Sequence, residues 1–284
     1  MYIVAGVTGH VGSVVARDLL AKHAKLKVIV RSAEKGAAWS KQGAEVAVGS
    51  LDDAAFLTTA LKGATGFFVL LPPNVQATDF FADQKRTADA IASAVKSSSV
   101  KHVVMLSSVG ANHPAGTGPI KGLHYLENVL RTTGTTLTAV RAGSFQENIA
   151  MAFVPAKQMG IFANFAPSAD YPMPQIASRD IGHLAAELLL AGPTKSEVVD
   201  LHGPAYSNRE AAEKLGKALG KTLQVIDVPA SAHLETLMQA GLPKPVAEQY
   251  AEMYDGAAKG LLTPAGDRLV QGKTTLDETI KNLL

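Results

Sequence analysis

Short apolar runs alternate with segments of helical periodicity through residues 1–200. The apolar runs have the length of β-strands and cover 2–5, 26–30, 45–48, 66–71, 100–107, 136–141 and 198–202. Between them, apolar side chains recur at intervals of three and four residues within 10–20, 52–62, 78–97, 119–132 and 178–190. Because the runs are continuous rather than alternating, we expect a parallel sheet with helices on both faces. The pattern predicts a doubly wound α/β fold.

The pattern changes near residue 150. Segment 152–177 combines several prolines with aromatic residues, which favours an irregular lid or pocket wall over another strand and helix. Ser207 and Glu210 have the spacing of a capping box at the start of a helix. The later periodicity predicts three helices, at 207–219, 229–240 and 245–260.

This change divides the chain into two parts. We expect a sheet domain at 1–150, to which 178–203 returns, and a smaller, mostly helical C-terminal lobe made of 151–177 and 204–284. Aromatic residues in and just before the proline-rich segment are candidates for a pocket wall that holds a flat ring, and core packing is the alternative. They are Phe145, Phe153, Phe162, Phe165 and Tyr171.

Composition excludes several classes of function. The chain has no cysteine, which excludes disulfides, thiolate nucleophiles and cysteine-ligated metal sites. Its formal charge is only +2, without a long basic run, so we expect a small-molecule substrate and no nucleic-acid partner. The histidines lack the spacing of a metal site, and no metal is expected. With neither a signal region nor a long apolar stretch at the N-terminus, we expect a cytoplasmic protein without a membrane partner.

The strongest motif is a glycine-rich turn between the first predicted strand and the first predicted helix. It reads Gly6-Val7-Thr8-Gly9-His10-Val11-Gly12. Glycine allows the backbone to turn tightly and to approach a pyrophosphate, whose charge is favoured by the N–H groups and dipole of the following helix. In this position the motif predicts a Rossmann-type dinucleotide site. The expected contacts are Gly6, Thr8, Gly9, His10, Val11 and Gly12.

The residue after the second strand discriminates between the two nicotinamide dinucleotides. Arg31 stands where an acidic residue would bind the ribose 2′-hydroxyl of NAD, whereas arginine suits the 2′-phosphate of NADP. Lys35 lies close enough to assist. One charge-assisted hydrogen bond contributes roughly 1.5–3 kcal/mol, about one to two orders of magnitude in affinity. NADP(H) is therefore expected over NAD(H), and a solvated Arg31 is the alternative.

Further strand ends are expected at the same crevice, because open α/β sheets bind ligands beyond the carboxyl ends of their strands. Each has a structural alternative, since Asp52 could cap a helix, the prolines could end a strand and the serines could form a turn. These candidates are Ser50, Leu51, Asp52, Leu71, Pro72, Pro73, Ser107 and Ser108.

In these residues the chain resembles the NmrA-like group of atypical short-chain dehydrogenases/reductases. An ordered set of motifs carries the resemblance over nearly the whole chain: the glycine motif at 6–12, Val-Arg-Ser at 30–32, Gly-Ser-Leu-Asp at 49–52, Leu-Pro-Pro at 71–73, Ser-Ser-Val-Gly-Ala at 107–111, Glu127, Leu130, Arg141, Phe145, Glu147, Asn148 and Arg-Asp-Ile-Gly at 179–182. The resemblance implies NADP(H) binding, with quinone, azo or dye reduction, or redox sensing without turnover in some members. Gly143 and Phe145 are also expected to contact the cofactor.

The chain departs from the wider superfamily at its catalytic pair. By the same resemblance, extended members carry Tyr-x-x-x-Lys on the helix after the fifth strand, and the matching positions here are Pro119 and Leu123. The tyrosine of this motif is the acid that protonates the product. Without it, reductions that leave an alkoxide are disfavoured, since a positioned proton donor raises the rate about 10²–10⁴-fold. A quinone yields a less basic phenolate that water can protonate, so proximity to the nicotinamide suffices.

Nearby side chains are candidate substitutes for the missing pair. Lys121 could donate a proton or anchor the cofactor, and His124 could act as an acid or base near neutral pH. These two residues are the catalytic candidates. Tyr125 shares a helix face with Lys121 in the reverse of the family order, and we assign it a structural or surface role. Asp180 is expected to cap the helix that starts near Ser178.

The sequence therefore predicts an NADPH-dependent oxidoreductase that passes hydride to a quinone-like or other conjugated acceptor. A non-catalytic NADP(H)-binding sensor with a protein partner is the alternative from a different class. A reductase of phenolic double bonds or ethers is a weaker alternative, because it needs Lys121 or another donor at the substrate. The sequence is compatible with a monomer and with a homodimer.

Overall fold

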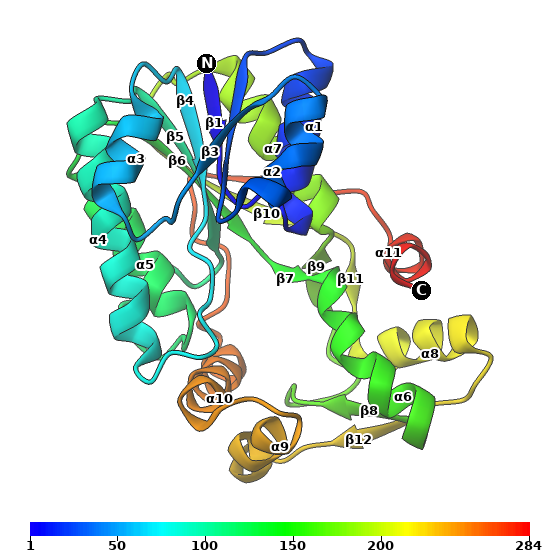
Figure 1. Cartoon of the computed structure of the whole chain (residues 1–284). Helices are drawn as coiled ribbons and strands as arrows, with labels where there is room; N and C mark the ends of the chain where they lie inside the picture. The colour runs from blue at the N-terminus through cyan, green and yellow to red at the C-terminus, as the bar shows by residue number, and fades with distance from the viewer.

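A computed structural model describes the whole chain, residues 1–284. Its main feature is one sheet of parallel strands: β1 Tyr2–Val4, β2 Leu26–Val30, β3 Glu45–Val48, β4 Gly66–Val69, β5 His102–Ser108, β6 Thr136–Ala142, β10 Glu197–His202 and β13 Arg268–Gln271. The spatial order is β13-β10-β6-β5-β4-β1-β2-β3 (Figure 1). The order reverses at β1, which pairs with both β2 and β4. The predicted doubly wound sheet is confirmed.

Helices cover both faces of the sheet (Figure 1). One face carries α1 His10–Ala21, α2 Ala33–Lys41 and α7 Ser178–Ala191, and the other carries α3 Ala54–Leu61, α4 Phe80–Ser98 and α5 Ile120–Arg131. Successive side chains of a strand point to opposite faces. Accordingly, Val4 packs in the core on the α1 side and Ile3 in the core on the α4 side, both almost fully buried. Helix α2 was not predicted, because only Gly36 and Trp39 within it are buried.

The lobe is mostly helical, as expected, but its proline-rich segment is less irregular than predicted and contains short strands. It contains a 3₁₀ helix at Gln146–Ala152, α6 Phe153–Met159, β8 Ile161–Asn164, α8 Asn208–Leu219, β12 Gln224–Asp227, a 3₁₀ turn at Ala230–Ala232, α9 His233–Gln239, α10 Lys244–Ala258 and α11 Leu276–Leu283. Strand β8 pairs with β12, and β9 Met173–Ile176 pairs with β7 Ser144–Phe145 and β11 Ala205–Tyr206. These strands are too short to show a period, and their partners are distant in sequence.

Two other expectations about the C-terminal half need correction. Strand β13 pairs with β10 in the large sheet, so the stretch 204–284 is not lobe throughout. The aromatic residues do not form one pocket wall either. Phe153 and Phe162 pack in the lobe core, Phe165 stacks on Tyr254 at 4.8 Å between ring centroids, and Tyr171 is exposed. Most of these aromatic residues instead pack at separate places within the lobe.

Asp180 does not cap α7, contrary to expectation. The helix is preceded by Ala177, and the Asp180 carboxylate turns to the segment between β13 and α11. There it accepts hydrogen bonds from the N–H groups of Lys273 and Thr274, both at 2.9 Å, and from the Thr274 hydroxyl at 2.6 Å. Asp180 therefore fastens the C-terminal segment to the sheet domain. The predicted capping box of Ser207 and Glu210 is present at the start of α8.

Replacing Asp180 by Ala should leave the N–H of exposed Lys273 and the N–H and hydroxyl of buried Thr274 without their acceptor. We expect the free energy of unfolding to fall by about 1–3 kcal/mol, measured by urea denaturation. Asp277→Ala, which removes an exposed pair with Lys214 on α11, is the matched control and should cost less than about 1 kcal/mol. Equal losses in the two variants would contradict the fastening role of Asp180.

None of the helices combines the length and the apolar character that a membrane crossing requires.

Candidate functional site

The glycine-rich turn after β1 is built on close backbone contacts. Gly6 has a φ of +72°, a conformation that glycine adopts at no steric cost. A Cβ atom on Gly12 would lie 2.5 Å from the Gly6 carbonyl oxygen and 2.7 Å from that of Ala5. On the other side, a Cβ on Gly6 would lie 2.4 Å from Leu70, just beyond β4. The turn therefore packs closely against the end of β4, beside β1, where the strand order reverses.

The start of α1 is open to a ligand. Gly9 occupies the N-cap position with no side-chain cap, and the first turn contains no acidic residue. The first N–H of the helix with a backbone partner is that of Ser13, which donates to Gly9 at 3.2 Å. A Cβ on Gly9 would meet only the Gly6 carbonyl oxygen, at 3.4 Å, and Thr8 and His10 beside it are exposed. The free N–H groups and helix dipole make this turn an anion site.

The two predicted cations stand at the end of the neighbouring strand. Arg31 directly follows β2, and Lys35 lies in the first turn of α2. Both are exposed, and neither forms an ion pair or a side-chain hydrogen bond within the chain. Their charges therefore remain available to a phosphate beside the glycine turn.

The strand-end candidates after β3 and β4 have different surroundings. Ser50, Leu51 and Asp52 link β3 to α3, and Asp53 rather than Asp52 caps that helix by accepting from Phe56 N–H at 3.0 Å. The capping alternative for Asp52 is therefore wrong. After β4, Leu71 is buried, whereas Pro72 and Pro73 are exposed at the edge of the sheet.

Ser107 belongs to a buried network instead of facing a ligand. Its hydroxyl donates to Glu127 Oε1 at 2.6 Å, and Arg141 donates to both carboxylate oxygens at 2.9 and 2.7 Å. All three residues are buried. Because the Ser107 hydroxyl is used inside the core, the prediction of a direct cofactor contact is not supported. Ser108, half-buried at the strand end, donates to the Val109 carbonyl at 3.0 Å.

The candidate proton donors on α5 are engaged within the protein. Lys121 Nζ donates to Glu252 on α10 at 2.5 Å. His124 Nδ1 donates to the Ala111 carbonyl at 2.8 Å, since a carbonyl oxygen only accepts, and its Nε2 accepts from Asn128 at 2.9 Å. As both imidazole nitrogens are bonded, His124 has no free position toward a substrate. Glu252 was missed because it lies 131 residues from Lys121.

Tyr125 is also held away from the sheet edge. Its hydroxyl donates to Asp89 on α4 at 2.7 Å. This hydrogen bond to a carboxylate, with a small contribution from burial, raises the pKa of the Tyr125 phenol. A phenol whose proton is retained in this way is a poor acid.

The end of β6 brings further polar groups to the same edge. Gly143 is buried there and donates its N–H to the Leu201 carbonyl at 2.9 Å. Phe145, two residues on in β7, packs against the core on the α1 side. A Cβ on Gly143 would lie 3.4 Å from the His202 ring, whose Nε2 is buried without a partner. Burial lowers the pKa of His202, although nearby Asp200 opposes this shift.

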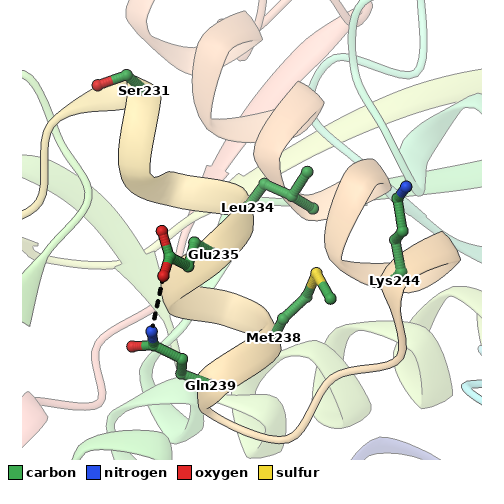
Figure 2. Close-up of a pocket in the computed structure, with 6 residues that line it drawn as sticks. All are labelled: Ser231, Leu234, Glu235, Met238, Gln239 and Lys244. Carbon is green, nitrogen blue, oxygen red and sulfur yellow. Dashed lines mark hydrogen bonds between the residues drawn. The ribbon is translucent and has the colours of Figure 1, made fainter.

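Two pockets lie away from these strand ends. Figure 2 shows one of about 570 Å³ on the outside of the lobe, with side chains from α9 and the start of α10. It is lined by Ser231, Leu234, Glu235, Met238, Gln239 and Lys244. A second, of about 610 Å³, lies between α1 and α7. Neither is lined by any of the strand-end residues expected at the cofactor site.

Comparison with known proteins identifies the family of the chain. The model of the NmrA-like family matches residues 2–274. The chain belongs to the NmrA-like family. It is 28% identical to the NAD(P)H azoreductase of Xenophilus azovorans, over 89% of this chain and 86% of the relative. It is 27% identical to quinone oxidoreductase 2 of Escherichia coli, over 100% and 98% of the two chains.

A solved structure confirms the fold. The triphenylmethane reductase of Citrobacter sp., crystallised with NADP(H), superimposes with a TM-score of 0.83 at 23% identity and covers the whole of both chains. This similarity extends over the sheet domain and the lobe together. The observed sheet, the reversal of its strand order at β1 and the lobe are therefore those of a known NmrA-like architecture.

Replacing Glu127 by Gln should leave the Arg141 guanidinium buried without a counter-charge. We expect the free energy of unfolding to fall by about 3–5 kcal/mol in urea denaturation. Glu197→Gln, at a more exposed pair with Arg268 in the same sheet, is the control and should cost about 1 kcal/mol or less. If both variants lose the same small amount, the Ser107–Glu127–Arg141 network does not stabilise this strand edge.

Proposed function

We propose that this protein is an NADPH-dependent oxidoreductase that passes hydride to a quinone-like or other conjugated acceptor. The observation that supports the proposal best is the uncapped start of α1 beside two unpaired cations, Arg31 and Lys35. Relatives that match most or all of the chain are an NAD(P)H azoreductase and a quinone oxidoreductase. The names of both relatives describe the reduction of a conjugated acceptor, an azo compound or a quinone. This favours a conjugated acceptor for the present protein as well.

The residues at the sheet edge fit a dinucleotide. The N–H groups at the start of α1 would hold the pyrophosphate, and the missing Cβ atoms of Gly9 and Gly12 leave room for its approach. Arg31 and Lys35 would pair with a 2′-phosphate, which supports NADP(H) over NAD(H). The nicotinamide half would lie along the ends of β4, β5 and β6, near Pro72, Ser108 and Gly143. When bound, the reduced nicotinamide supplies a hydride.

The proton chemistry supports an acceptor that needs no strong acid. Pro119 and Leu123 replace the superfamily pair, and the nearby Lys121, His124 and Tyr125 are bonded within the protein. A quinone that gains a hydride and one proton becomes a hydroquinone, and water can supply that proton. A reductase of phenolic double bonds or ethers is less well supported, because Lys121 is already bound by Glu252.

The same lack of a free donor favours a second candidate, a non-catalytic NADP(H) sensor. A sensor needs the dinucleotide site and no proton donor at all. Turnover distinguishes the two candidates, because only the oxidoreductase consumes NADPH.

NADPH oxidation should depend on the acceptor. We expect the purified protein to oxidise NADPH with a naphthoquinone, because hydride transfer to it leaves a phenolate that water can protonate, and to leave a simple aliphatic ketone unreduced. An azo dye is a second acceptor to test, because one relative is an NAD(P)H azoreductase. The measurement is loss of the reduced nicotinamide absorbance with each acceptor. Tight NADPH binding without turnover on any acceptor would identify the sensor, and rapid ketone reduction would reveal a proton donor outside α5.

Arg31→Ala should weaken NADPH binding by about 10- to 100-fold and leave NADH binding unchanged, because only NADPH carries the 2′-phosphate. Lys35→Ala should also weaken NADPH binding, by a smaller factor than Arg31→Ala. The measurement is titration of each cofactor by calorimetry. Lys41→Ala, an exposed lysine in the last turn of α2, is the control. Tighter binding of NADH than NADPH by the unmodified protein would contradict the assignment of Arg31.

A further inference from the structure

The loop that follows β5 is in direct backbone contact with α10 of the lobe. The loop runs over residues 109–119 and contains Gly116 and Gly118, whose φ angles are +80° and +56°. A Cβ on Gly118 would lie 1.9 Å from the Gln249 carbonyl oxygen. In the reverse direction, a Cβ on Gly256 would lie 2.1 Å from the Gly116 carbonyl oxygen. Only glycine fits at these points, so the loop and α10 meet in one defined arrangement.

Glu252 lies between these contacts and binds the sheet domain twice. Its Oε1 accepts the Gly116 N–H at 2.9 Å, and its Oε2 accepts from Lys121 Nζ at 2.5 Å. The side chains of Lys121 and Glu252 are 19% and 31% exposed, so water screens their pair only in part. A single carboxylate thus joins α10, the loop and α5 through two charge-assisted hydrogen bonds.

The loop begins at the end of β5, where the proposed function places the nicotinamide and its acceptor. Its first residue, Val109, follows Ser108 at the end of β5 and donates its N–H to the Ala142 carbonyl at 3.1 Å. The chain just after α10 also packs on this loop. A Cβ on Gly110 would lie 2.5 Å from the side chain of Leu262. A Cβ on Gly116 would lie 3.0 Å from the side chain of Leu261. Any displacement of α10 would therefore move the loop that borders the nicotinamide end of the site.

We propose that Glu252 is a positioning residue for the acceptor side of the site, and that Lys121 acts through Glu252 instead of donating a proton. Glu252 holds loop 109–119 against α10 and so fixes one wall of the acceptor site. This inference rests on the proposed oxidoreductase function for its effect on catalysis. The arrangement of the loop itself is measurable without turnover.

Hydrogen exchange at the Gly116 amide tests the contact directly. In Glu252→Ala this N–H loses its acceptor, and we expect its exchange to accelerate by roughly tenfold or more. Glu252→Gln keeps a neutral acceptor oxygen and should accelerate exchange less. The Ser13 amide, which donates to Gly9 within α1, should not change in either variant. Unchanged exchange at Gly116 in Glu252→Ala would overturn the proposal, whether or not the protein turns over any acceptor.

Steady-state kinetics test the role of Lys121. We expect Lys121→Met and Glu252→Gln each to raise the KM for the acceptor roughly three- to tenfold and to leave kcat within about twofold. The double variant should be no worse than either single variant, because the two residues act as one unit. Lys121→Arg should restore most of the KM, since arginine also donates to a carboxylate.

The matched control is Glu248→Gln on the same helix, which removes an exposed pair with Lys244 and should leave both kinetic constants unchanged. A large fall in kcat for Lys121→Met, with Glu252→Gln unaffected, would make Lys121 a catalytic residue and overturn the proposal. If the unmodified protein shows no turnover, the proposed function fails, while the exchange of Gly116 still decides whether Glu252 holds the loop.

Discussion

The structure depends on one backbone contact that only glycine permits, between Gly12 in the first turn of α1 and the carbonyl oxygens of Ala5 and Gly6. This contact brings α1 down onto the end of β1, at the point where the strand order reverses. A side chain at Gly12 would push the helix away from the sheet and close the space in front of its N–H groups. The open anion site and the packing of α1 on the core are thus consequences of the same missing atom.

The site is supported differently on its two sides. Beneath β5 and β6, the Ser107–Glu127–Arg141 network is buried and joined by three hydrogen bonds, which favours a rigid strand edge. On the lobe side, the connections are carboxylates near the surface, Asp180 at the C-terminal segment and Glu252 at the loop after β5. The strand edge is therefore part of the core, whereas the lobe is held to it by contacts that solvent weakens.

The sequence predicted what depends on short-range pattern and missed what depends on distant partners. Continuous apolar runs identified the central strands, because parallel strands are buried on both faces, and the glycine motif lies between β1 and α1, as predicted. Strands β8 and β12 escaped notice because each has four residues and pairs only with the other. Lys121 and Ser107 were placed at the site by position alone, and their partners Glu252 and Glu127 could not be read from local spacing.

Strand β13 has a consequence for how the lobe can move. The chain leaves the large sheet after β10, builds α8, α9 and α10, and then returns to pair β13 beside β10. It had already left the sheet after β6 and returned at α7. The lobe is therefore anchored by several chain crossings and not by a single linker. A rotation of the lobe about one flexible connection is therefore excluded, because every crossing would have to deform together.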